Sequence, residues 1–225
     1  MALEMIQKAL ERAERERNNA LAKITRIENE FSGEEFKKLF IKRAEMAMIE
    51  HRTPGKFIVD ENNKGILNLM YYYATRTNVD MINPTVGIVL AGKYGCGKSI
   101  MMSAFCKVLT DLVLPPTEKV EEIHAMALAE MIKKNGVMPY AKKPLLIQDL
   151  GKEENMQNNY GTKMNPIGNL LAIRAEYGSL TFASTNYIWK SLEDHYSEYI
   201  TTRMREHVTF MVLPGDSRRK DFSKL

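Results

Sequence analysis

The sequence predicts an α/β fold: a mostly parallel sheet flanked by helices and preceded by a small all-helical N-terminal module. Two observations predict it. After residue 53, apolar runs of strand length alternate with helix-length segments, which is the pattern of parallel strands joined by crossover helices. Before that point the apolar periodicity is helical, and it stops at a Thr-Pro-Gly break. We therefore divide the chain into a module at 1–52 and a larger domain at 53–225.

The N-terminal module is predicted to contain two helices. In residues 1–31 the apolar positions step alternately by three and four, which is the heptad spacing of a helix that pairs along a narrow seam. Arg17 interrupts this seam, so the segment fits a helix lying on its own domain as well as one that pairs with a partner or a second copy. Ser32 and Glu35 form a capping-box pattern, and we expect the second helix to run to about Glu50.

A glycine-rich stretch, GKYGCGKS at 92–99, matches G-x-x-x-x-G-K-[ST] in full. It lies between a strand-like run at 86–91 and a helical segment at 100–109, which is the context that a phosphate-binding loop requires. Its backbone N–H groups and the following helix N-terminus favour an anion. We expect Lys98 to reach the β- and γ-phosphates and the Ser99 hydroxyl to bind Mg²⁺. The expected nucleotide contacts in this stretch are Gly92, Tyr94, Gly95, Cys96, Gly97, Lys98, Ser99 and Ile100.

Two later strands are expected to bring polar groups to this loop. LLIQD at 145–149 predicts a strand ending in a carboxylate, and LTFA at 180–183 predicts a strand followed by Ser-Thr-Asn. Ligands of parallel sheets bind at the carboxyl ends of the strands, so Asp149 and Asn186 are expected near the γ-phosphate. From position alone, Asn186 is explained equally well as a turn residue. We further expect strands at 120–124 and 207–213 and helices at 66–73, 125–134, 166–177 and 189–206.

Composition favours a cytoplasmic protein. No apolar run approaches the length of a membrane span, and the N-terminus is charged where a secretory signal would be apolar. Cys96 and Cys106 lie in the glycine-rich loop and on the helix after it, where a disulfide would distort the loop, so a reducing compartment fits best. The net charge of +4 argues only weakly for or against nucleic acid. The four histidines lack the spacing of a zinc site.

Taken in order, GKYGCGKS, LLIQDLG, LTFASTN, TTRMRE and GDSRR resemble the motifs of AAA+ ATPases, in particular the DnaC-type helicase loaders and the IstB-type transposition helpers. Similar proteins carry a Walker A loop, an I-D-D-L-G Walker B strand, a T-S-N sensor, an arginine before a bulky apolar residue, and a closing G-x-S-x-R. The resemblance covers about residues 56–221 and does not extend to the helical module. It implies an AAA+ domain at 53–225 that binds ATP or ADP with Mg²⁺ and hydrolyses ATP.

The resemblance also implies roles for single residues and for partners. Lys98, Ser99 and Asp149 would act on phosphate and Mg²⁺, and Asn186 would be sensor 1. Arg203 matches an arginine finger that acts on the ATP of a neighbouring subunit, which implies self-association. Arg219 matches the basic residue of the closing motif, which implies that it also contacts the nucleotide. The implied partners are single-stranded DNA and, through the N-terminal helices, a replicative helicase or a transposase.

One departure from the family pattern concerns Mg²⁺. Aligning I-Q-D-L-G with I-D-D-L-G puts Gln148 where the Mg²⁺-associated aspartate belongs. Glutamine cannot supply the negative charge that offsets Mg²⁺, so we expect weak metal affinity or slow hydrolysis unless Asp149 or Glu153 takes the role.

These motifs leave three functions open. The leading one is an ATP-controlled helicase loader, and the second is a transposase helper with the same ATPase core. The third is a nucleotide-binding switch with little hydrolysis, which Gln148 suggests. A small-molecule kinase is disfavoured because it would not need Arg203 or the closing motif.

Overall fold

The structure, a computed structural model, describes residues 2–24, 31–77, 79–115, 118–154 and 165–218. Its centre is a five-stranded sheet with the strand order β2-β3-β4-β1-β5, in which every neighbouring pair is parallel. The strands are β1 (Gly87–Gly92), β2 (Glu121–His124), β3 (Leu145–Leu150), β4 (Thr181–Thr185) and β5 (Val208–Leu213). The predicted parallel sheet is therefore confirmed.

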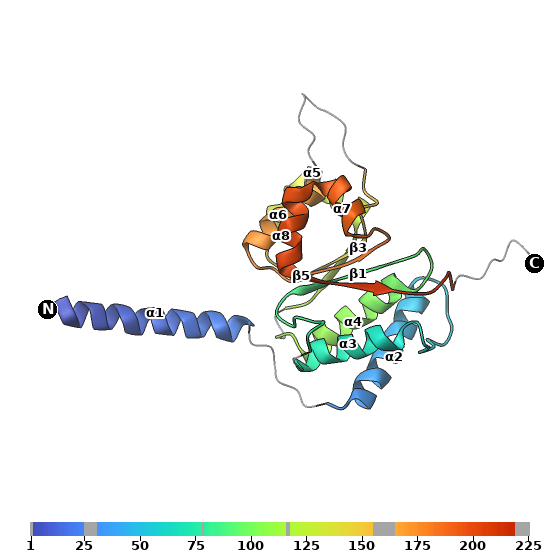
Figure 1. The fold of residues 1–225 in the computed structure, drawn as a ribbon, viewed down its shortest axis with the longest axis horizontal. Helices are drawn as coiled ribbons and strands as arrows, with labels where there is room; N and C mark the ends of the chain where they lie inside the picture. The colour runs from blue at the N-terminus through green and yellow to red at the C-terminus, as the bar shows by residue number, and fades with distance from the viewer. Residues whose placement is uncertain (1, 25–30, 78, 116–117, 155–164, 219–225) are drawn as a thin grey trace, which may run out of the picture.

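The helices form layers on both faces of this sheet (Figure 1). One layer consists of α2 (Gly33–Glu50), α3 (Lys64–Thr75) and α4 (Lys98–Leu112). The other consists of α5 (Ala125–Asn135), α6 (Pro166–Glu176), α7 (Trp189–Tyr196) and α8 (Glu198–His207). A 3₁₀ turn, η1 (Met138–Tyr140), precedes β3. Two helical layers account for the apolar composition of the strands, because both faces of the sheet are covered.

Strand β1 shows how the core is divided. Ile88 and Leu90 point into the core beneath α3 and α4, whereas Val89 between them joins the core formed with α5 and α6. All three side chains are fully buried. Alternation along a strand therefore builds two cores on one sheet, and it holds β1 firmly below the glycine-rich loop that follows it.

Helix α2 begins with the predicted capping box. The Ser32 hydroxyl accepts the N–H of Glu35 and the Glu35 carboxylate accepts the N–H of Ser32, at 3.2 and 2.8 Å. Phe36 and Phe40 of α2 are buried in the same core as α3 and α4. Packing thus joins α2 to the sheet domain, while the assignment of residues 1–52 to partner binding stays a proposal.

Helix α1 (Ala2–Ile24) has a different environment. Figure 1 shows it extending away from the sheet, and its apolar residues Met5, Ile6 and Leu10 are 59–70% exposed. The predicted helix of residues 1–31 is confirmed over Ala2–Ile24, residues 25–30 lie outside the described part of the chain, and Phe31 is not helical. Among the described helices, none is long and apolar enough to cross a membrane.

The single helix predicted at 189–206 is wrong, because the chain forms two helices there. Ser197 separates α7 from α8 with φ 90° and ψ 155°, a conformation that no helix contains. The N–H of Ser197 still donates to the Glu193 carbonyl, and its own carbonyl accepts from Thr201. The apolar positions on either side keep helical spacing, so their pattern gave no sign of the break.

Candidate nucleotide-binding site

The glycine-rich loop connects β1 to α4, as the sequence predicts. Gly95 and Gly97 have φ of 77° and 107°, which side chains with a Cβ rarely adopt. A Cβ at Gly95 would collide with Ser217. Because helix α4 begins at Lys98, its unpaired N–H groups and its positive dipole end face the loop. This backbone provides the anion-binding site that the phosphates of a nucleoside triphosphate require.

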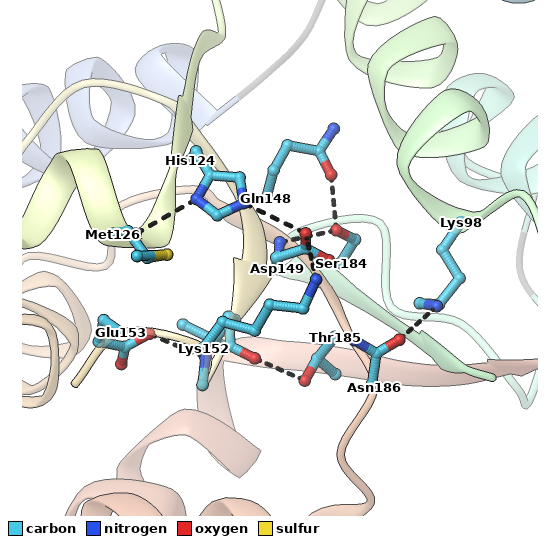
Figure 2. Close-up of polar contacts among 12 residues, drawn as sticks. Lys98, His124, Met126, Gln148, Asp149, Lys152, Glu153, Ser184, Thr185 and Asn186 are labelled. Atoms are coloured by element: carbon cyan, nitrogen blue, oxygen red, sulfur yellow. Dashed lines mark hydrogen bonds and ion pairs between the residues drawn. The ribbon is translucent and has the colours of Figure 1, made fainter. Parts of the chain in front are cut away.

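Lys98 lies inside this loop. Its Nζ donates to the carbonyl of Lys93 at 2.7 Å. It also donates to Oδ1 of Asn186 at 2.8 Å (Figure 2). Burial lowers the pKa of the Lys98 ammonium, an effect that the neighbouring Cys96 and Asp149 partly oppose. The structure therefore brings the loop lysine and the tip of β4 together.

Asp149 occupies an irregular position near the end of β3. The register between β3 and β4 shifts between Ile147 and Leu150, and Asp149 has φ 58°. Its Oδ2 accepts from Lys152 Nζ at 2.7 Å and lies 3.2 Å from His124 Nε2. Burial raises the pKa of Asp149, but the hydrogen bond and charge of Lys152, together with His124, outweigh it, so this pKa lies below its ordinary value. Asp149 is consequently an anion at neutral pH.

His124 is held in one tautomer. Its Nδ1 accepts the N–H of Met126 at 3.3 Å as the N-cap of α5, so the proton of the neutral ring is on Nε2 and faces Asp149 (Figure 2). Sequence reasoning missed both His124 and Lys152. His124 could be found only from the register of β2 on β3, which pairs it with Gln148. Lys152 follows Asp149 by three residues, and this spacing points to it.

Gln148 is fixed at both ends of its amide. Its Nε2 donates to the carbonyl of Ser99 at 3.1 Å and to Oε1 of Glu122 at 2.8 Å, and its Oε1 accepts the hydroxyl of Ser184 at 2.5 Å. The side chain is nearly fully buried. Gln148 is thus bonded through both atoms of its amide, as a structural side chain is.

Glu153 does not substitute for the missing acid. Its side chain is fully buried, and its carboxylate accepts the N–H of Gly151 at 3.0 Å and the hydroxyl of Tyr196. These bonds tie the end of the β3 loop to α7, so Glu153 is committed to the core. Of Asp149 and Glu153, Asp149 is therefore the remaining candidate carboxylate for Mg²⁺.

Both expected cofactors fit the residues present. The glycine-rich loop and the buried Lys98 suit the phosphates of ATP or ADP. Protein sites for Mg²⁺ commonly use one or two carboxylates together with substrate phosphates, and Asp149 with the Ser99 hydroxyl supplies such a set.

The other expected nucleotide contacts lie around the loop. Tyr94 is exposed, and Lys152 Nζ lies 5.2 Å from the centre of its ring. Cys96 is buried, while Ile100 is partly buried in the first turn of α4. An exposed aromatic ring at this edge is accessible to a ligand, whereas Cys96 acts as packing beneath the loop.

The closing motif lies directly against the loop, a contact that the sequence did not predict. The N–H of Arg218 donates to the carbonyl of Gly95 at 2.9 Å, and Asp216 pairs with Lys93 at 2.8 Å. The Arg218 guanidinium reaches Asp60 at 2.8 Å. Arg219 itself lies outside the described residues.

Arg203 lies apart from this site. It pairs with Glu176, the last residue of α6, at 2.8 Å, and its guanidinium lies 4.7 Å from the ring centre of Tyr199. Helix α6 leads into the amino end of β4, whereas the phosphate loop follows the carboxyl end of β1. Arg203 therefore lies near the amino ends of the strands, whereas the phosphate loop of its own chain lies at their carboxyl ends.

No protein-family model matches the sequence, and no curated protein resembles it significantly in sequence. Several solved structures are similar in fold, among them the following three. The DnaC helicase loader gives a TM-score of 0.53 at 15% identity, covering 70% of this chain and 93% of that one. A putative primosome component from Streptococcus pyogenes gives 0.54 at 18%, covering 72% and 85%. The replication initiator DnaA bound to AMPPCP and single-stranded DNA gives 0.51 at 15%, covering 71% and 49%.

At these identities the similarity concerns the fold. The phosphate loop after β1, the parallel sheet around it and the match to nearly the whole DnaC chain agree on one architecture. The chain therefore shares the P-loop α/β fold of the DnaC helicase loader structure.

Proposed function

We propose that this chain is an ATP-dependent replicative helicase loader. In this proposal the domain at 53–225 binds and hydrolyses ATP with Mg²⁺, self-associates in the ATP state and contacts single-stranded DNA. The helices of residues 1–52 hold the helicase. The observation that carries the proposal is the bond from Lys98 to Asn186, because it joins the phosphate loop to the strand tip where a γ-phosphate would lie.

The chemistry follows from the side chains. The loop N–H groups bind the phosphates, and Lys98 transfers its hydrogen bond from Asn186 to a phosphate oxygen. Asn186, once released, orients the attacking water. Asp149 accepts a proton from that water, while Lys152 and His124 hold its carboxylate in place. Bound Mg²⁺ would supply positive charge that offsets the phosphates.

Two features support the proposed partners. The similar structures include a helicase loader, a putative primosome component and a replication initiator bound to single-stranded DNA. The apolar side chains Met5, Ile6 and Leu10 of α1 are exposed, as a helix that binds a partner would require. We also propose Arg203 as the residue that acts on the ATP of a neighbouring subunit, since it lies away from its own loop.

ATP turnover with and without single-stranded DNA tests the enzymatic part. We expect DNA to raise the rate, and Lys98→Ala to abolish turnover because the loop loses its cation. Lys134→Ala, on the surface of α5, is a matched control that should behave as wild type. Turnover that persists in Lys98→Ala would contradict the site assignment.

Co-purification tests the partner. The full chain should retain a replicative helicase, and a variant with Ile6→Asp and Leu10→Asp should lose it while keeping nucleotide binding. Retention of a transposase with no helicase would support the transposase helper, and capture of neither would contradict the role of residues 1–52.

A second function, a nucleotide-binding switch with little hydrolysis, is favoured by Gln148, whose amide oxygen is already bonded to Ser184. Enzymes commonly have turnover numbers of roughly 1–10³ per second. Wild-type turnover far below about 1 per second, with tight ATP binding, would favour the switch over the loader ATPase.

A further inference from the structure

Glu122 on β2 has two bonds that lead into the nucleotide-binding site. Its Oε1 accepts from Gln148 Nε2 at 2.8 Å, and its Oε2 accepts from the hydroxyl of Ser103 at 2.8 Å. Ser103 lies one helical turn after Ser99 on α4. The carboxylate of Glu122 therefore lies between the Walker B strand and the helix that carries the expected Mg²⁺ ligand.

The hydrogen bonds around Gln148 all run in one direction. The N–H of Asp149 donates to Ser184 Oγ at 3.0 Å, the Ser184 hydroxyl donates to Gln148 Oε1, and Gln148 Nε2 donates to Glu122 (Figure 2 shows the first two bonds). A carboxylate only accepts, so Glu122 fixes the direction of the whole chain of bonds. It also determines which way the Gln148 amide is turned.

The geometry points to an exchange of acid and amide between two neighbouring strands. We propose that Glu122 supplies the negative charge that Gln148 lacks, acting through the Gln148 amide as a positioning residue for Mg²⁺-dependent nucleotide binding. Hydrogen bonds to an ionised group are stronger than neutral ones, and outer partners of metal ligands tune metal affinity. This inference rests on the proposed function, because it assumes that ATP and Mg²⁺ bind beside Ser99 and Asp149.

A specific consequence distinguishes this proposal from a simple loss of charge at Gln148. If charge were only missing, Gln148→Glu would improve Mg²⁺ binding. In the observed geometry, Gln148→Glu instead places a second carboxylate within hydrogen-bond distance of Glu122, and the two anions repel. The single change should therefore impair the site, and Glu122→Gln in the same chain should restore an acid–amide pair.

Binding of a fluorescent ATP analogue, measured with and without Mg²⁺, tests the proposal in Glu122→Gln, Gln148→Glu and the double variant. We expect Glu122→Gln to reduce the gain in affinity from Mg²⁺ by about tenfold and to leave Mg²⁺-free binding unchanged. The double variant should recover most of the gain. Glu121→Gln is the matched control, since it removes the same charge from the adjacent position of β2, on the opposite face of the strand.

Thermal unfolding of the nucleotide-free variants gives a second readout. Gln148→Glu should lower the Tm, and adding Glu122→Gln should raise it again because the like-charge contact is removed. The role of Glu122 would be overturned if Glu122→Gln and Glu121→Gln had the same effect on the gain in affinity from Mg²⁺. It would also be overturned if the single variant Gln148→Glu increased that gain. A wild-type chain that binds no ATP analogue would overturn the proposed function and, with it, the Mg²⁺ role. The two failures are therefore distinguishable.

Discussion

Arg174 is a fully buried cation surrounded by oxygen atoms. Its guanidinium donates to the Thr181 hydroxyl and the Lys143 carbonyl at 2.9 Å, to the Leu180 carbonyl at 2.6 Å, and to the carbonyl of Tyr140. Burial lowers its pKa to about 10. One side chain thereby satisfies buried carbonyls from the segments that lead into β3 and β4.

Replacing this guanidinium should be costly. Arg174→Met keeps an unbranched apolar stem but leaves several buried carbonyls unsatisfied, so we expect the free energy of unfolding to fall by about 3 kcal/mol or more. Urea denaturation measures it. Arg205→Met is the control, because its pair with Glu193 is partly exposed and should contribute no more than about 1 kcal/mol. Equal losses in the two variants would show that the Arg174 bonds add no stability.

At the same scale, the sequence predicted the residues of the phosphate loop and missed those beside it. The motif places Lys98 and Ser99 because its spacing is fixed by one loop. His124 and Glu122 reach the site only through the register of β2 on β3, which depends on packing across the whole sheet. Local pattern therefore identified the anion cradle, whereas the side chains that hold Asp149 and Gln148 required the structure.

Among the elements, the loop after β3 is tied to α7 by Glu153 and Tyr196. Tyr196→Phe removes one donor from a fully buried carboxylate, so we expect stability to fall by about 2 kcal/mol. ATP turnover should fall as well, because the same loop positions Asp149 and Lys152. Tyr199→Phe, at an exposed ring, is the control for both measurements. A loss of turnover without a loss of stability would show that Tyr196 does not act through its hydrogen bond to Glu153.

The break between α7 and α8 gives a prediction of opposite sign. Ser197 has φ 90° and ψ 155°, a region that is favourable for glycine and strained for other residues. Ser197→Gly should therefore raise the free energy of unfolding by about 1 kcal/mol, since its backbone bonds are kept. Ser191→Gly inside α7 should lower stability by a similar amount. Two losses would show that Ser197 is not strained.

The same break shows where element prediction fails. Helical spacing continues across Ser197 in the apolar residues Leu192, Tyr196, Ile200 and Met204. The helices are separated only by the backbone of Ser197, which adopts a conformation typical of glycine. Periodicity reports which face is buried, and that face is continuous here. Element order elsewhere was predictable where a glycine, proline or capping residue marks a boundary, as Ser32 does before α2, Gly136 after α5 and Asn165 before α6.

For the whole molecule, the position of Arg203 limits how it can act. It lies near the edge of the sheet opposite to its own phosphate loop, and its pair with Glu176 is partly exposed. Such surface pairs contribute about 1 kcal/mol or less, so Arg203 can leave Glu176 at little cost. A head-to-tail contact between two copies would let this edge of one chain meet the loop of the next.

A mixing experiment tests this arrangement. Arg203→Ala and Lys98→Ala should each turn over ATP poorly alone, because one lacks the arginine for its neighbour and the other lacks its own loop lysine. In an equal mixture, roughly a quarter of the sites combine an intact loop with an intact neighbouring Arg203, so activity should reappear. Lys98→Ala mixed with Arg205→Ala gives the reference for an arginine not expected to act across subunits. If activity in the first mixture stays at the sum of its parts, Arg203 does not act across subunits, and the head-to-tail assembly must be built on another edge.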